Sequence, residues 1–259
     1  MIKSRLNRPP PAPSLQWAYF LDVDGTLINI ADTPQAVLVG QSLLDLIDNL
    51  YRACSGALAL VSGRMISDLQ DRTQLMQLPL AGLHGLERRD STGRLWIHAA
   101  PLAAKGAIKD ALEPILARYP GLLLEDKGLT LALHYRQAPY LAAYVHRLMG
   151  HLASSHGPEL ELQRGKFVVE IKPAGINKGT AVSEYLSESP FKGRRAVFIG
   201  DDQNDEQGFA AVNAQGGVSI KVGKGPSCAL FRLPDVAAVH QWLGSALPEL
   251  KSKESHEES

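Results

Sequence analysis

Residues 19–29, YFLDVDGTLIN, decide the fold of this chain. An apolar run ends in two aspartates one residue apart, Asp22 and Asp24, which are followed by Gly25 and Thr26. Burying carboxylates beside a hydrophobic strand is costly unless another group offsets their charge. In open α/β sheets, ligands bind at the carboxyl ends of the strands. The stretch therefore predicts a buried strand that ends in a charged binding site.

The composition is that of an ordinary globular protein. The 259 residues are 45% hydrophobic and 21% charged, which allows a sizeable core. The 27 basic and 27 acidic residues balance, so the net charge gives no support for a nucleic-acid partner. Cys54 and Cys228 are expected to be free thiols in a reducing compartment. Because the N-terminus is not a signal peptide and no apolar run reaches the roughly 18 residues of a membrane helix, we expect a cytoplasmic protein without a membrane partner.

Short apolar runs alternate with segments of helical periodicity along most of the chain. Strands are expected at residues 17–23, 57–62, 78–85, 195–200 and 216–223. Helices are expected at residues 41–54, 64–73, 177–186, 204–212 and 235–247. This alternation predicts an α/β core with a parallel sheet and helices on both faces.

The middle of the chain has a different pattern, with antiparallel strands and helices that cover one face. It predicts an inserted α+β domain at residues 98–173, between core segments at 17–97 and 174–250. Residues 1–16 are rich in proline and predict a disordered arm. Residues 251–259 are polar and charged and predict a disordered tail.

Polar side chains follow two more of the expected strands. Ser62, Gly63 and Arg64 follow one of them, and Asp201, Asp202 and Asp205 follow another, while Lys178 starts a helix. If these strands are neighbours, the carboxylates of Asp22, Asp24 and Asp201 converge, with Lys178 and Ser62 beside them. Converging carboxylates favour Mg²⁺, and Lys, Ser and backbone N–H groups favour a phosphate.

Four segments in this order, DVDGT, SGR, NKG and GDDQNDE, resemble the motifs of the haloacid-dehalogenase (HAD) superfamily of phosphatases. The resemblance covers most of the chain outside the tails. It implies a Rossmann-like core in which Asp22 attacks phosphorus to form an aspartyl-phosphate, and Asp24 is the general acid and base. Ser62 and Lys178 would hold the transferring phosphoryl group. The insert would be a C2-type cap over the site.

The same resemblance implies a Mg²⁺ site. Asp22, the backbone carbonyl of Asp24, and Asp201 would hold the ion, and Asp202 and Asp205 would complete or orient the site. A capping or solvated carboxylate is the alternative for Asp202. The remaining core positions expected to contact substrate are Gly25, Gly63 and Arg64, with Gly25 keeping the turn free of a Cβ beside the phosphate.

The segments LHGLE, LALHYR and KFVVEIKPAGINKG extend the resemblance to trehalose-6-phosphate phosphatases. It implies sugar-binding roles for Lys166 and Glu170, which are expected on the polar face of one cap strand. It implies the same role for His134 and Arg136, which are expected on the polar face of a second cap strand. His84 and Glu87 would lie at the junction of cap and core, with a purely structural histidine as the alternative for His84. The sequence departs from the family at Asn204, where Thr is usual and where either residue can cap the following helix.

These resemblances imply Mg²⁺-dependent hydrolysis of trehalose 6-phosphate in trehalose biosynthesis, with a possible synthase partner. A phosphatase for sucrose phosphate or mannosyl-phosphoglycerate shares the core motifs and is the first alternative. An inactive domain that senses sugar phosphate beside a synthase, or a mutase, are the others. For the cap residues, a solvent-exposed sheet face is the competing interpretation.

Overall fold

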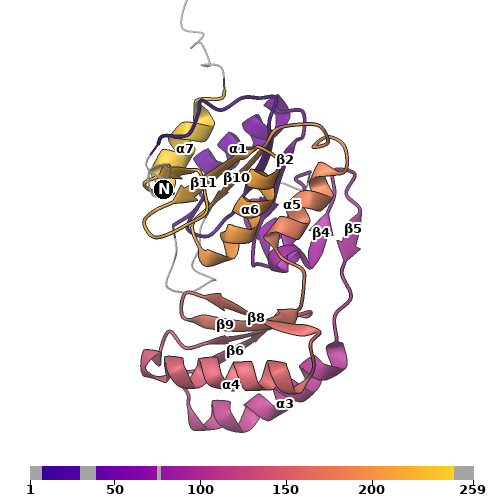
Figure 1. Cartoon of the computed structure of the whole chain (residues 1–259), viewed down its shortest axis with the longest axis vertical. Coiled ribbons are helices and arrows are strands. Elements are labelled where there is room, and N and C mark those ends of the chain that lie inside the picture. Colours follow the sequence, from indigo (N-terminus) through magenta and orange to yellow (C-terminus); the bar gives the residue numbers. More distant parts are fainter. Residues whose placement is uncertain (1–7, 30–38, 75–76, 248–259) are drawn as a thin grey trace, which may run out of the picture.

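The computed structural model describes residues 8–29, 39–74 and 77–247, arranged as a core and a smaller cap (Figure 1). The core holds one eight-stranded sheet in the order β12-β11-β10-β1-β2-β3-β4-β5. Its strands are β1 (Ala18–Leu21), β2 (Leu58–Val61), β3 (Leu80–Gly82), β4 (Glu87–Arg89), β5 (Leu95–Ile97), β10 (Ala196–Gly200), β11 (Val218–Val222) and β12 (Phe231–Leu233). The first six in that order pair in parallel, and β4 and β5 add an antiparallel hairpin.

Helices cover both faces of this sheet, which confirms the predicted fold class. They are α1 (Gln41–Ala53), α2 (Ile66–Thr73), α5 (Lys178–Leu186), α6 (Glu206–Ala214) and α7 (Val236–Gly244). The chain leaves β1 toward β2 through α1 and leaves β10 in the opposite direction toward β11 through α6. Right-handed crossovers in opposite directions put α1 and α6 on opposite faces. Within the described residues, no helix is both long and apolar enough to cross a membrane.

The cap lies between β5 and α5 along the chain. Its sheet, in the order β6-β7-β9-β8, consists of β6 (Leu123–Asp126), β7 (Leu131–His134), β8 (Leu160–Gly165) and β9 (Val168–Pro173). Helices α3 (Leu102–Arg118) and α4 (Ala142–Ser155) cover the side of this sheet away from the core (Figure 1). The expected alternation is confirmed, because Leu133 and Val169 are buried in the cap's apolar core while His134 and Glu170 line the cleft on the other side.

Two local expectations are corrected. Part of the expected N-terminal arm packs against the core, where the Trp242 indole donates to the Pro11 carbonyl at 3.0 Å and the Tyr19 hydroxyl donates to the Ser14 carbonyl at 2.9 Å. A proline-rich segment still offers carbonyl acceptors, so it can dock without being a helix or strand. Residues 1–7 of that arm and the tail at 251–259 lie outside the described residues. Lys166 is not on a strand, because β9 begins at Val168 and Lys166 lies in the hairpin turn before it.

Candidate active site

Three neighbouring strands end at the same edge of the core sheet. Leu21 at the end of β1 pairs with Ile199 of β10 and with Leu60 of β2. Since the three strands are parallel and in register, their next polar residues emerge together. These residues are Asp22 after β1, Ser62 after β2 and Asp201 after β10. The three strands are therefore neighbours in the sheet, as the predicted convergence of these side chains required.

Lys178 joins two of the carboxylates at this edge. It is the first residue of α5, whose N-cap Asn177 accepts the N–H groups of the next turn. Its Nζ donates to Asp22 Oδ1 and to Asp205 Oδ1, both at 2.6 Å, and all three side chains are buried. Burial alone would lower the pKa of Lys178, but attraction to the two carboxylates outweighs it and raises that pKa. Lys178 is thus a fixed cation beside Asp22.

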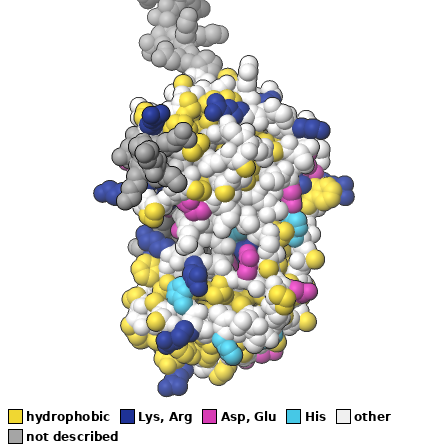
Figure 2. Space-filling view, in the orientation of Figure 1, with side chains coloured by type: hydrophobic (Ala, Val, Ile, Leu, Met, Phe, Trp, Pro, Cys, Tyr) yellow, Lys and Arg dark blue, Asp and Glu magenta, His cyan; other side chains and the backbone are white. Residues whose placement is uncertain are grey.

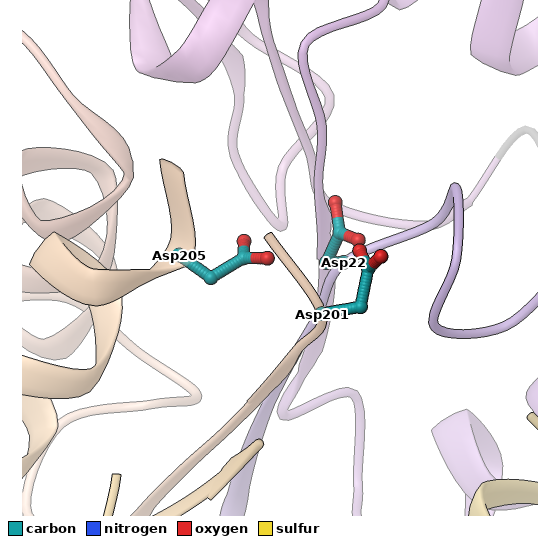
Figure 3. Close-up of side chains that lie close together, drawn as sticks. All are labelled: Asp22, Asp201 and Asp205. Atoms are coloured by element: carbon teal, nitrogen blue, oxygen red, sulfur yellow. The ribbon is translucent and has the colours of Figure 1, made fainter. Parts of the chain in front are cut away.

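The site carries more negative than positive charge. Carboxylate oxygens of Asp22, Asp201 and Asp205 lie within 4.8 Å of one another, and Figure 3 shows all three side chains pointing toward one region. Burial, followed by repulsion from Asp205, raises the pKa of Asp22 well above its usual range. Burial and the neighbouring carboxylates raise the pKa of Asp201 to about 6. Such a cluster is favourable when a cation offsets its charge.

Two further observations suit a bound cation. Oδ1 of Asp201 is buried and has no hydrogen-bond partner among the described residues. At Gly25, whose φ is +88°, an added Cβ would lie 2.2 Å from Asp201 Oδ2, so glycine is required for this close approach. The donors are all oxygens, which hard divalent cations such as Mg²⁺ prefer. The residues present therefore fit the expected metal.

Asp202 and Asp205 have different roles in the turn η4 (Gln203–Asp205). Oδ1 of Asp202 accepts the N–H of Gln203 at 2.7 Å, which is the capping alternative for this residue. Oδ2 of Asp205 accepts the N–H of Asp202 at 2.9 Å, while its other oxygen contacts Lys178. Asp205, and not Asp202, belongs to the acidic cluster. Asn204, which could have capped the next helix, does not do so, and its side-chain oxygen accepts from Gln163 of the cap.

Asp24 is paired with an arginine on the wall of the site. Nε and Nη2 of Arg64 each donate to one oxygen of its carboxylate, both at 2.6 Å. Arg64 also donates to Asp68, which in turn accepts from Arg72, at 2.8 Å in each case. Arg64, which was expected to contact the substrate, thus contacts Asp24, the residue expected to be both general acid and general base. Asp68 and Arg72 were missed by sequence reasoning, since their helical spacing also suits an ordinary solvent-exposed ion pair.

Ser62 and Gly63 form a compact turn against His84. Oγ of Ser62 accepts the N–H of Arg64 at 3.1 Å, and the Ser62 carbonyl accepts the N–H of His84 at 2.9 Å. A Cβ at Gly63 would lie 2.7 Å from Cε1 of His84. Nδ1 of His84 is buried without a hydrogen-bond partner in the described part of the chain, and burial lowers its pKa.

Glu170 brings the cap against this turn. It accepts from Thr130 Oγ1 at 2.5 Å, lies 3.4 Å from Lys127 Nζ, and lies 3.6 Å from His84 Nε2. Burial alone would raise the pKa of Glu170, but these three partners lower it, so the carboxylate is ionised. Lys127 also donates to the Gly63 carbonyl at 3.2 Å. Sequence reasoning missed Lys127, which lies in the short connection between β6 and β7.

The other expected cap and junction residues have separate surroundings. His134 contacts Glu125 at 2.8 Å, and the guanidinium of Arg136 lies 5.3 Å from the centre of the Phe167 ring. Glu87 accepts the N–H of Ile66 at 2.5 Å, at the start of α2. Glu87 is therefore placed at a helix N-terminus, while His134 and Arg136 face the cleft.

A cleft of about 750 Å³ lies between the core and the cap. Figure 2 shows acidic, basic and histidine side chains along the boundary of the two domains on the visible face. The cleft brings together these expected site residues: Asp22, Asp24, Ser62, Gly63, Arg64, His84, His134, Arg136, Lys166, Glu170, Lys178, Asp201 and Asp202. Gly25, Glu87 and Asp205 are not on its wall. The volume is in the range of small-molecule sites.

Comparison with known proteins agrees with this geometry. The trehalose-phosphatase family profile matches residues 20–236. This chain belongs to the trehalose-phosphatase family. It is 43% identical over 249 residues to trehalose-6-phosphate phosphatase of Escherichia coli K12, which covers 96% of this chain and 93% of that protein. It is 47% identical over 208 residues to the "Probable trehalose-phosphate phosphatase" of Sinorhizobium fredii, covering 80% and 78%.

A solved structure shares the fold. The C-terminal domain of the trehalose-6-phosphate phosphatase of C. albicans superimposes with a TM-score of 0.79 at 22% identity, covering 92% of this chain and 98% of that one. These findings confirm the predicted family, a phosphoric monoester hydrolase with a HAD-type core and a separate cap.

Proposed function

We propose that this trehalose phosphatase hydrolyses trehalose 6-phosphate to trehalose and inorganic phosphate, with Mg²⁺ as cofactor. The observation that carries the proposal is the buried pair of Asp22 and Lys178 on the floor of a cleft closed by a polar cap sheet. An anionic nucleophile held beside a fixed cation suits attack on a phosphate monoester. A cap lined with charged and polar side chains suits the hydroxyl groups of a disaccharide.

The reaction would proceed in two displacements. A carboxylate oxygen of Asp22 bonds to phosphorus while the bond to the sugar oxygen breaks, and Asp24 gives that oxygen a proton. Water then attacks phosphorus and gives a proton to Asp24, while the bond from phosphorus to Asp22 breaks. Phosphate leaves, and Asp22 is again a carboxylate. Lys178, Ser62 and the N–H groups of the turn at Gly63 offset the charge of the phosphoryl oxygens. For Asp24 to donate, its carboxyl must first leave Arg64.

Asp22, Asp201 and the backbone carbonyl of Asp24 would hold the magnesium ion, with Asp205 orienting the site through Lys178. A bound ion would neutralise charge on the phosphoryl oxygens during transfer. Asp202 holds the turn that carries Asp205 in place. Gly25 leaves the space that Asp201 occupies.

The cap side chains would grip the sugar. Glu170, held ionised by Lys127 and Thr130, can accept hydrogen bonds from hydroxyl groups, and His134, Arg136 and Lys166 line the same cleft. His84 would hold the cap through Glu170, and Glu87 would act indirectly by fixing the start of α2, which their contacts support. The proposal also includes a cytoplasmic location and association with the synthase that makes the substrate, which co-purification of the two proteins tests.

The test is phosphate release from a panel of sugar phosphates with and without Mg²⁺. The panel contains trehalose 6-phosphate, sucrose 6-phosphate, mannosyl-phosphoglycerate and glucose 6-phosphate. We expect trehalose 6-phosphate to have the highest kcat/KM and EDTA to abolish turnover. A tenfold preference for another member, about 1.4 kcal/mol of discrimination, would show that the substrate is wrong. No turnover of any member would favour a binding role.

A further inference from the structure

The cap touches the core on two sides of the cleft. On one side Glu170 of β9 lies beside His84. On the other, Nε2 of Gln163 on β8 donates to Oδ1 of Asn204 in η4. Gln163 and Glu170 are directly opposite each other in the β8–β9 pairing, so they project from the same face of the cap sheet. A single cross-strand pair therefore reaches the core at both of these contacts.

Asn204 lies in the turn η4, next to a member of the acidic cluster. It directly precedes Asp205, which holds Lys178. Asp202 and Asp205 supply the side-chain hydrogen bonds that stabilise this turn, so the Asn204 amide is not consumed by capping. The amide is half-buried at the wall of the cleft and is directed at the cap. A contact here ties the position of the cap to the turn that carries the acidic cluster.

The chemistry of the pair suits a contact that must also open. Both side chains are neutral amides, so parting them in water leaves no unpaired charge. The bridge uses Nε2 of Gln163 and Oδ1 of Asn204. The other two amide atoms, Gln163 Oε1 and Asn204 Nδ2, have no hydrogen bond within the described part of the chain, so they can bind water or ligand at the edge of the cleft. On the opposite side the contact involves charged groups, because the Glu170 carboxylate lies 3.6 Å from His84 and its cap partner Lys127 donates to the Gly63 carbonyl of the core.

We propose that Gln163 and Asn204 are positioning residues whose amide bridge sets the closed position of the cap over a bound sugar phosphate. The inference rests on the proposed function, because it assumes that the cap closes on the sugar. A bridge present throughout the closed state stabilises bound substrate and transition state equally. Its loss therefore raises KM and changes kcat little. A small aryl phosphate, which reaches only the core site, is unaffected.

A reciprocal exchange of the two side chains tests the bridge. Gln163→Asn shortens the cap side by one methylene, and Asn204→Gln lengthens the core side by one. We expect each single change to raise KM for trehalose 6-phosphate about three- to tenfold, the range of a lost neutral hydrogen bond. The double variant restores the combined length, and its KM should return to within about twofold of the unmodified protein.

Controls separate this effect from general damage. Gln137→Asn, at an exposed cap position outside the cleft, should leave KM unchanged, and all variants should hydrolyse 4-nitrophenyl phosphate as the unmodified protein does. Three results would each overturn the bridge. They are an unchanged KM in both single variants, a KM in the double variant that is raised by the product of the two single effects, and equal losses of activity on both substrates. Failure of the proposed substrate is distinguishable, because it appears in the unmodified protein. The exchange is then measured with the sugar phosphate that this protein prefers.

Discussion

At the scale of single residues, Asp22 and Asp24 are separated by one position but have different surroundings. Lys178 and Thr26 hold Asp22, and Arg64 holds Asp24. We expect Asp22→Asn to lower kcat by roughly three decades or more, because the nucleophile is lost. Asp24→Asn should keep the nucleophile and stall after phosphoryl transfer from a good leaving group.

Intact-mass measurement after mixing with 4-nitrophenyl phosphate distinguishes these two variants. An adduct of one phosphoryl group is expected on Asp24→Asn and not on Asp22→Asn. Asp45→Asn on the exposed side of α1 is the control for an aspartate exchange without consequence. An adduct on the Asp22→Asn protein would identify a different nucleophile.

Asp201 gives a second prediction at this scale, concerning pH and metal. Its folded-state pKa of about 6 lies above its ordinary value of 3.8. Between these two pH values, the Asp201 carboxyl of metal-free protein keeps its proton in the folded state and loses it in the unfolded state. Its contribution to stability is therefore complete below pH 3.8 and is lost as pH rises through about 6. Asp201→Asn imitates the protonated form. In EDTA at pH 7.5 the variant should be more stable by on the order of 1 kcal/mol, with little difference at pH 3.5.

Thermal unfolding with EDTA and with MgCl₂ measures both parts of this prediction. Mg²⁺ should raise the Tm of the unmodified protein and raise that of the variant much less, because a ligand that binds only the folded state stabilises it. An equal response of the two proteins to Mg²⁺ would remove Asp201 from the metal site.

At the scale of elements, Glu87 of β4 fixes the start of α2. The N-cap residue of that helix, Met65, provides no side-chain hydrogen bond, and Glu87 accepts the N–H of Ile66 instead. Glu87→Ala should cost about 1 kcal/mol and lower Tm by about 2–4 °C. Glu87→Gln keeps the acceptor oxygen and should remain near the unmodified Tm. A large rise in KM with unchanged Tm in both variants would instead place Glu87 at the substrate.

The elements themselves could be predicted where burial dominates the sequence pattern. The strands Leu58–Val61 and Ala196–Gly200 contain no polar side chain because they are covered on both faces. Strand ends then placed Asp22, Ser62 and Asp201 together. Side-chain pairings could not be predicted, because they depend on how segments that are distant along the chain pack against each other. Asp24 with Arg64 and Gln163 with Asn204 are contacts over 40 and 41 residues of chain.

Turn geometry set a second limit on prediction from the sequence. Period-two alternation assigns faces only within a strand, and the chain leaves that pattern at Phe167, whose φ is +64°. Lys166 consequently lies in a hairpin turn, even though it still lines the expected cleft. The polar face of the cap strands was predictable, whereas the position of its first residue was not.

At the scale of the whole molecule, chemistry and recognition lie on separate domains. The core holds the nucleophile, the lysine and the acidic cluster, and the cap presents Glu170 and Lys166 across the cleft. Substitutions in the cap should therefore affect substrates in proportion to how far they extend beyond the phosphate. A comparison of trehalose 6-phosphate with 4-nitrophenyl phosphate measures this separation.

We expect Glu170→Ala to lower kcat/KM for trehalose 6-phosphate by about one to two decades, since it removes a charged hydrogen-bonding group and its hold on Lys127. Lys166→Ala should have a smaller effect, because this side chain is exposed in a turn and gives up little ordered contact. Both variants should keep their activity on 4-nitrophenyl phosphate within about threefold, and exposed Glu113→Ala on α3 is the control. Equal losses on both substrates, with a lowered Tm, would mean that Glu170 supports the fold of the cap. No loss on either substrate would mean that the sugar lies elsewhere in the cleft.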